Sequence, residues 1–288
     1  MATDFEPISK TYFSQGLNLH YLDWGNEEAP LLFLLHGMRD HARSWDWVAS
    51  ELRHDWRVVV PDLRGHGDSE WSPNGAYHTP YYLLDFADLV ETFDCDQISI
   101  AAHSFGGNPA ARFAALYPQR VRKLVLIDAM GPTGQVKSRW NKQGVVQRTR
   151  EWLEKSRDIT LSSPRRYASL DQAIARMAEA NEHLSIDQAR HLAIHGARHY
   201  PDGYGWKYDP RIWNMVPEDF AFDLAEYWRE ISAPTLLMWG TESWTTNPAT
   251  DGSAAHFRDH CTLSFKDAGH WLHHDQLDAF LAALREFL

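Results

Sequence analysis

An apolar run that ends abruptly at a serine constrains the fold of this chain more than any other stretch. Residues 97–107 read Gln-Ile-Ser-Ile-Ala-Ala-His-Ser-Phe-Gly-Gly. The run predicts a buried strand and the residues after Ser104 predict a helix, so the serine lies at the turn between them. A turn this tight needs small residues two positions before and after the serine, and Ala102 and Gly106 meet that need. The stretch therefore predicts a strand, a strained turn and a helix in immediate succession.

Short segments that are apolar at nearly every position recur along the chain and alternate with segments of helical spacing. A strand that is apolar on both faces is expected where helices cover both sides of a parallel sheet. The alternation therefore favours an α/β fold with an open, mostly parallel sheet and helices on both faces, preceded by an antiparallel hairpin. We expect strands at 11–13, 17–22, 31–35, 57–60, 97–102, 121–127, 233–240 and 262–265, and helices at 45–52, 81–92, 105–117, near 254 and at 276–288.

The alternation of strands and helices stops between residues 131 and 231. This segment has helical spacing, many arginines and several tryptophans, and no run that predicts a buried strand. We interpret it as a helical cap inserted into an α/β core. The domain organisation we expect is a first part of the core at 1–130, the cap at 131–231 and a second part of the core at 232–288.

The charge balance narrows the classes of partner. The chain has 28 Lys and Arg against 39 Asp and Glu, a net charge of −11, which gives no electrostatic support for binding nucleic acid or an anionic membrane. No run of about 18 apolar residues predicts a membrane span, and residues 1–7 lack the features of a signal peptide. Cys95 and Cys261 form no metal or redox motif. We expect a cytoplasmic protein, a monomer or homodimer, that binds a small molecule without a cofactor.

Polar residues follow the expected strands at the points where those strands end. Because the carboxyl ends of parallel strands meet at one edge of a sheet, residues far apart in sequence come together there. A serine, carboxylates and histidines are all present among them, which are the residue types of nucleophilic catalysis. The strand ends carry His36-Gly37-Met38, Asp62, Ser104, Asp128, Glu242-Ser243 and Gly269-His270.

Four of these stretches make the chain resemble the α/β-hydrolase fold family. The stretch around Ser104 is close to the G-x-S-x-G nucleophile elbow, with Ala102 in place of the first glycine. His36-Gly37 follows the strand at 31–35, the loop 62–69 reads Asp-Leu-Arg-Gly-His-Gly-Asp-Ser, and Ala-Gly-His occupies 268–270. In the family a serine, an acid and a histidine occur in that chain order. The resemblance implies a hydrolase whose site is built at the carboxyl edge of the sheet.

The resemblance also implies a role for each residue. Ser104 would be the nucleophile and His270 the base that removes its proton. The backbone N–H groups of Met38 and Phe105 would form the oxyanion hole. The histidines at 273 and 274 are rival bases, but neither has the preceding glycine.

The acid is the point at which the sequence departs from the family pattern. Family members often carry Asp three residues after the glycine that ends the penultimate strand, and here that position is Ser243. A serine cannot balance the charge of an imidazolium. Asp128 and the neighbouring Glu242 are the two candidates. Certain haloalkane dehalogenases place the acid at the end of the earlier strand, so we favour Asp128 and keep Glu242 as the alternative.

We predict the residues that contact substrate from their positions relative to this site. Histidines at 191, 195 and 199 recur every fourth residue, but without a carboxylate at matched spacing we expect a polar lining and no metal site. The aromatic-rich cap should roof the pocket, which favours an apolar or aromatic ligand. The residues expected to contact substrate are His36, Arg39, His103, Trp140, Trp244 and Trp271.

The function these features predict is hydrolysis of a carboxylic ester, or a similarly activated carbonyl, of a small apolar or aromatic molecule. The reaction would pass through an acyl-enzyme on Ser104. One alternative is hydrolysis of a C–C bond in a diketone-like substrate, which uses the same triad. A second is a non-catalytic small-molecule-binding protein on the same scaffold, suggested by the missing acid at Ser243. Haloalkane dehalogenases and epoxide hydrolases need a carboxylate where this chain has Ser104.

Overall fold

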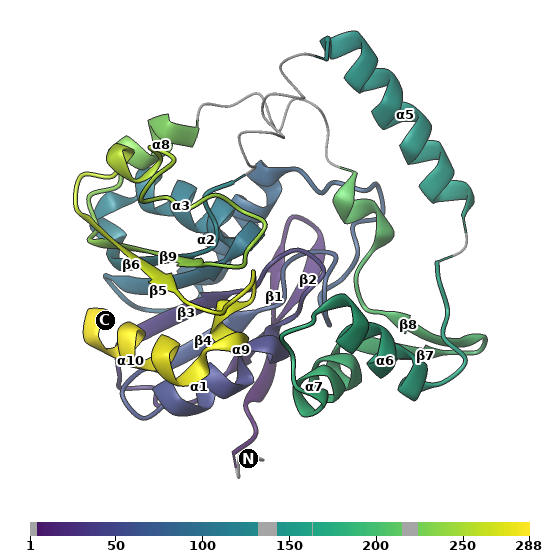
Figure 1. Ribbon diagram of the computed structural model, residues 1–288, viewed down its shortest axis with the longest axis horizontal. Helices are drawn as coiled ribbons and strands as arrows, with labels where there is room; N and C mark the ends of the chain where they lie inside the picture. Colours follow the sequence, from purple (N-terminus) through teal and green to yellow (C-terminus); the bar gives the residue numbers. More distant parts are fainter. Residues whose placement is uncertain (1–4, 132–142, 163, 215–223) are drawn as a thin grey trace.

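The computed structural model describes residues 5–131, 143–162, 164–214 and 224–288. Its centre is an eight-stranded sheet in the order β1-β2-β4-β3-β5-β6-β9-β10 (Figure 1). The hairpin of β1 and β2 is antiparallel and joins β4 in antiparallel register, whereas the strands from β4 to β10 run parallel. The mostly parallel α/β sheet predicted from the sequence is confirmed.

The sheet strands lie close to their predicted positions, because a short apolar run suits a strand that helices cover on both faces. All five residues of β3 and all six of β5 are buried. The strands are β1 (Ile8–Ser14), β2 (Leu17–Asp23), β3 (Leu31–Leu35), β4 (Arg57–Pro61), β5 (Ile98–His103), β6 (Val121–Ile127), β9 (Thr235–Gly240) and β10 (His260–Phe265).

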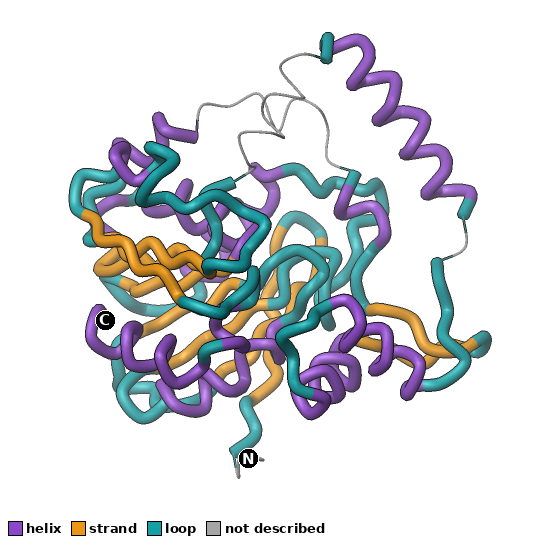
Figure 2. Tube along the Cα trace, in the orientation of Figure 1, coloured by secondary structure: helices purple, strands orange, loops and turns teal. Residues whose placement is uncertain are grey.

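Helices cover the sheet from both sides (Figures 1 and 2). One apolar core joins the sheet to α2, α3 and α8 through side chains such as Phe86, Phe113 and Trp228. A second core, on the opposite face, joins it to α1 and α10 through Val48 and Phe280. The helices are α1 (Asp46–Leu52), α2 (Thr79–Glu91), α3 (Gly107–Leu116), α8 (Leu224–Glu230), α9 (Leu272–Asp275) and α10 (Leu277–Phe287).

The segment between the two parts of the sheet contains helices and one small hairpin. Its elements are α5 (Val145–Leu161), α6 (Leu170–Ala180), α7 (Ile186–Gly196), β7 (Ala197–Tyr200), β8 (Gly203–Trp206) and the 3-10 helix η4 (Pro210–Trp213). The hairpin of β7 and β8 was not predicted. Ala197 and Gly205 are its two buried strand residues, and its sequence does not alternate between apolar and polar residues. The long helix α5 runs along the edge of the molecule (Figure 1). None of the described helices combines the length and apolar character needed to cross a bilayer.

One predicted helix is wrong. The chain near Ala254 forms a single 3-10 turn, η6 (Ala254–His256), within a loop. The Asp251 carboxylate accepts hydrogen bonds from the backbone N and the Oγ of Ser253, at 2.8 and 2.5 Å. Such local side-chain bonds compete with the helical ladder and favour a turn.

Candidate active site

The turn after β5 holds Ser104 in a conformation that few residues adopt. Ser104 has φ +50°, in the left-handed region, and the 3-10 turn η2 (Ser104–Gly106) leads directly into α3. A Cβ atom on Gly106 would lie 2.6 Å from the carbonyl oxygen of His36, so only glycine lets the turn approach β3 this closely. The predicted need for small residues around the serine is thus explained by the neighbouring strand. The strain presents the serine at the carboxyl edge of the sheet.

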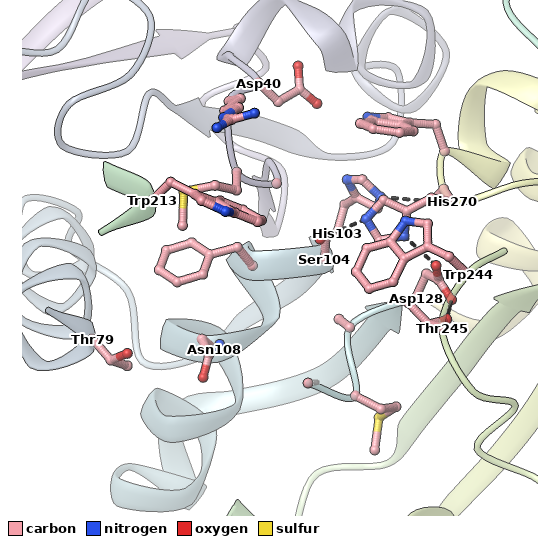
Figure 3. Close-up of a pocket in the computed structure, with 18 of the residues that line it drawn as sticks. Asp40, Thr79, His103, Ser104, Asn108, Asp128, Trp213, Trp244, Thr245 and His270 are labelled. Carbon is pink, nitrogen blue, oxygen red and sulfur yellow. Dashed lines mark hydrogen bonds and ion pairs between the residues drawn. The ribbon is translucent and has the colours of Figure 1, made fainter. Parts of the chain in front are cut away.

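Ser104, His270 and Asp128 form a continuous hydrogen-bonded chain (Figure 3). The Nε2 atom of His270 lies 2.8 Å from the Oγ of Ser104, and its Nδ1 donates to the carboxylate of Asp128. His270 and Asp128 are 8% and 5% exposed, so water does not screen their interaction. The three residues come from the ends of β5 and β6 and from the loop after β10. This arrangement can take a proton from a hydroxyl and stabilise the resulting imidazolium.

The carboxylate of Asp128 is held by two hydroxyl groups that sequence reasoning did not assign to the site. Ser243 Oγ donates to it at 2.5 Å and Thr245 Oγ1 also donates to it. The backbone is fixed by a 2.8 Å bond from the Asp128 N to the carbonyl oxygen of Met238, which continues the pairing of β6 with β9. Ser243, which we interpreted as a missing acid, therefore orients a carboxylate that comes from the neighbouring strand. In the sequence, the only sign of this role is that two hydroxyl residues, Ser243 and Thr245, lie two positions apart.

The alternative acid lies elsewhere. The side chain of Glu242 is half exposed and its Oε2 lies 3.1 Å from Nε2 of His183. It has no contact with His270 among the interactions of the described residues. The rival base His273 is fully buried and stacks on Trp45 with ring centroids 4.6 Å apart.

His36 supports the site from behind and does not line the cavity, contrary to the prediction that it contacts substrate. Its Nδ1 donates to the carbonyl oxygen of Gly37 at 2.7 Å, and its Nε2 accepts from the backbone N of Leu63 at 3.0 Å. Burial lowers the pKa of His36 to about 3, so the ring is neutral and can make both bonds. A Cβ on Gly37 would lie 3.1 Å from the Cβ of Ser104. His36 therefore fixes the loop after β3 against the serine.

The remaining predicted contacts line a cavity of about 1540 Å³ that opens at Ser104. Met38 and Phe105, the expected oxyanion donors, both line it, as do Arg39, His103, Trp244 and Trp271. His103 is buried and donates from Nε2 to the carbonyl oxygen of His270 at 2.9 Å, so it also positions the loop that carries His270. Trp140 lies outside the described residues. Further aromatic side chains of the wall are Trp152, Trp206, Tyr208, Trp213 and Trp228.

Two clusters among the described residues have metal-ligand atoms within 4.8 Å of one another: Asp46 with His191 and His195, and His20 with Asp62 and Asp68. In the first, Arg43 Nε already lies 2.7 Å from the Oδ2 of Asp46, so a protein cation occupies the carboxylate. In the second, Asp62 accepts from three donors, which are the His20 ring and the backbone N of Ala42 and of Asp68. We assign a metal to neither. His199 lies on β7, beyond the end of α7, so the three spaced histidines do not share one helix.

The family follows from the comparison with known sequences. A model of the alpha/beta hydrolase fold matches residues 30–277, which is most of the chain. The chain belongs to the α/β-hydrolase fold family. The matched residues include Ser104, Asp128 and His270, which form the hydrogen-bonded chain.

Curated relatives of this α/β-hydrolase share about a third of their residues with it over the aligned regions. A serine hydrolase-like protein of Danio rerio is 30% identical over 66% of this chain, and a 3-hydroxybutyrate-oligomer hydrolase of Cupriavidus necator is 31% identical over 77% of it. The chain covers 58% of the length of the Danio rerio protein, 31% of an uncharacterised Mycobacterium tuberculosis protein and 76% of the Cupriavidus necator hydrolase.

Solved structures share the whole fold. A thioesterase domain from the curacin biosynthetic pathway superposes with a TM-score of 0.84 at 21% identity, covering 98% of this chain and 99% of that chain. An esterase of M. tuberculosis superposes with a TM-score of 0.77 at 25% identity, covering 97% and 91%. These similarities support the assignment of the chain to the hydrolases and do not identify a substrate.

Proposed function

We propose that the protein is a serine hydrolase that cleaves a carboxylic ester, or a similarly activated carbonyl, through an acyl-enzyme on Ser104. The observation that carries this proposal is the 2.8 Å contact between Ser104 Oγ and His270 Nε2, backed by the bond from His270 Nδ1 to Asp128. A serine hydroxyl is too weak a nucleophile at neutral pH unless a base accepts its proton during attack. His270 is the base with the required geometry.

Acylation begins when Ser104 Oγ attacks the carbonyl carbon and its proton passes to Nε2 of His270. The carbonyl oxygen becomes an oxyanion that accepts hydrogen bonds from the N–H groups of Met38 and Phe105. The N-terminus of the helix that follows Ser104 adds a favourable dipole. Asp128 stabilises the imidazolium until the intermediate collapses, and His270 then gives the proton to the departing alkoxide.

Deacylation repeats these steps with water as the nucleophile. A water molecule loses a proton to His270 as its oxygen attacks the acyl carbon. The second tetrahedral intermediate collapses, the carboxylic acid leaves, and Ser104 regains the proton from His270. Each turnover consumes one water and restores every protein group.

We also propose that residues 131–231 act as a cap over the site, with 1–130 and 232–288 as the core. Support comes from three cap side chains, Trp152, Tyr208 and Trp213, that line the same cavity as Ser104. An aromatic roof favours a substrate with an apolar portion of modest size. The relatives named as a serine hydrolase-like protein, a hydrolase of 3-hydroxybutyrate oligomers and an esterase are consistent with this chemistry.

Hydrolysis of short p-nitrophenyl esters tests the proposal. We expect steady release of p-nitrophenolate by the wild-type protein and, for Ser104→Ala, a fall to a residual rate about 10³-fold or more lower. Equal, slow rates for the two proteins would contradict the proposal and favour the non-catalytic binding protein. If a fluorophosphonate modified Ser104 while no ester was turned over, the C–C hydrolase would become the better hypothesis.

A further inference from the structure

The cavity has a charge composition that differs from the rest of the chain. The chain is strongly acidic, with 39 Asp and Glu against 28 Lys and Arg. Among the described residues that line the cavity, cations outnumber carboxylates even when Asp128 is counted, and Asp128 is committed to His270. The cations are Arg39, Arg112, Arg148, Lys155 and Arg176, and the carboxylates are Asp40, Asp128, Glu151 and Asp251. Five cations and four carboxylates leave a small excess of positive charge in the cavity of an acidic protein, which favours a ligand with negative charge.

Arg39 directly follows Met38, the proposed oxyanion donor, and lines the same cavity as Ser104. Its guanidinium carbon lies 5.0 Å from the ring centroid of Trp213 and 5.7 Å from that of Tyr208. Its φ of +63° is rare for a residue with a side chain. No ion pair of Arg39 is found with any carboxylate in the described part of the chain. Aromatic rings thus hold its planar donor groups in place without neutralising them.

Lys155 faces the same space from α5. It lines the cavity and has no acidic partner within the residues described. Partial burial first, and then the positive charge of Arg39, lowers the pKa of Lys155. Both side chains line the cavity and both are exposed to solvent there. Two unpaired cations that repel each other are stabilised when an anion lies between them. Arg176, by contrast, is held by Glu179 at 2.9 Å.

We propose that Arg39 and Lys155 bind a carboxylate on the substrate, so that the natural substrate is an ester of an acid or alcohol that carries a second, free carboxyl group. The inference rests on the proposed esterase function and names its substrate class. Arg39 can donate two parallel hydrogen bonds to the carboxylate oxygens, and Lys155 adds charge from the cap side. Because Arg39 follows Met38 in the chain, we place the free carboxylate a few bonds from the ester carbonyl.

Monomethyl glutarate and dimethyl glutarate make a matched anionic and neutral pair for the test. In a pH-stat assay we expect kcat/KM for the anionic ester to exceed that for the neutral ester by about 10- to 100-fold, the value of a hydrogen bond to a charged group. Arg39→Asn should abolish this preference, so that the ratio of the two kcat/KM values falls to about one, because Asn tolerates positive φ and removes the charge. Arg39→Lys should keep part of the preference, and Lys155→Gln should reduce it. Arg176→Gln, which removes a cation already paired with Glu179, is the control and should leave it unchanged.

Calorimetric binding of both esters to Ser104→Ala separates this inference from the proposed function, since it needs no turnover. We expect the anionic ester to bind more tightly by a similar factor and to lose that advantage in Ser104→Ala/Arg39→Asn. Equal binding of the two esters would overturn the inference even if ester hydrolysis by Ser104 is confirmed. Tighter binding of methyl 4-phosphonobutyrate would also overturn it, by assigning the site to phosphonate or phosphate groups. Failure of hydrolysis together with Arg39-dependent anion binding would refute the esterase alone.

Discussion

Replacement of Asp128 by asparagine removes the negative charge behind His270 and keeps the size of the side chain. The Asp128 carboxylate accepts from His270 Nδ1, from Ser243 Oγ at 2.5 Å and from Thr245 Oγ1. An asparagine must present either its oxygen or its NH₂ group to the imidazole. Each orientation predicts a different loss of kcat, and the two losses set the lower and upper limits of the expected effect.

If the oxygen of the new Asn faces His270, the ring keeps its tautomer and loses only the charge-assisted part of the bond, which lowers kcat by about 10- to 100-fold. If the NH₂ group faces it, Nδ1 must accept a hydrogen bond, Nε2 carries the proton and Ser104 has no base, which lowers kcat by about 10⁴-fold. We expect Asp128→Asn to fall between these limits. Glu242→Gln should remain within about twofold of wild type, because the half-exposed carboxylate of Glu242 lies against His183, away from His270.

The assay is hydrolysis of a p-nitrophenyl ester, with kcat and KM measured for both variants and circular dichroism as the check of folding. A second variant tests the same geometry: Ser243 lies at hydrogen-bond distance from the Asp128 carboxylate, so adding Ser243→Asp to Asp128→Asn should recover part of the lost rate. Activity that survives Asp128→Asn and collapses in Glu242→Gln would refute the reasoning and return Glu242 as the acid.

Two predictions concern stability. Asp85→Asn should lower the free energy of unfolding, measured by urea titration, by about 3–5 kcal/mol. The Asp85 carboxylate accepts hydrogen bonds of 2.5 and 2.6 Å from Arg64, whose side chain is 2% exposed, so the variant would leave a buried charge without its partner. An unchanged urea midpoint would contradict this prediction. The free energy of unfolding should also decrease as pH falls below about 6.5. Burial lowers the pKa of His36 and His274 to about 3 and that of His66 to about 4. Between these values and about pH 6.5 the unfolded chain therefore binds more protons than the folded one, which favours unfolding. A urea midpoint that rises between about pH 7 and about pH 5 would show that other groups dominate.

Much of the fold could be predicted because a strand covered on both faces is largely apolar. The run at 31–35 coincides with β3, and the run at 121–127 coincides with β6. The β7–β8 hairpin could not be predicted in this way, because its residues are mostly exposed or partly exposed and it is held by pairing with its neighbour. At Ala254 local side-chain bonds outweigh helical propensity, which a search for periodicity does not detect.

Ser104 and His270 could be placed at the site by their positions at strand ends, but the partners of Asp128 could not. Ser243 and Thr245 lie in a loop whose position depends on the pairing of β6 with β9, in which Ile127 is opposite Met238. That register is a property of the assembled sheet and leaves no mark on the local sequence. The same is true of Arg39, whose stacking on Trp213 joins residues from the core and the proposed cap.

The acyl-enzyme on Ser104 is tested most directly by covalent labelling. Treatment with a fluorophosphonate followed by intact-mass measurement and peptide mapping should find one label per chain, on Ser104, formed more slowly in Asp128→Asn and not at all in Ser104→Ala. A protein that stays unlabelled while folded, or that carries its label on another residue, would contradict the proposal that His270 activates Ser104 as a nucleophile.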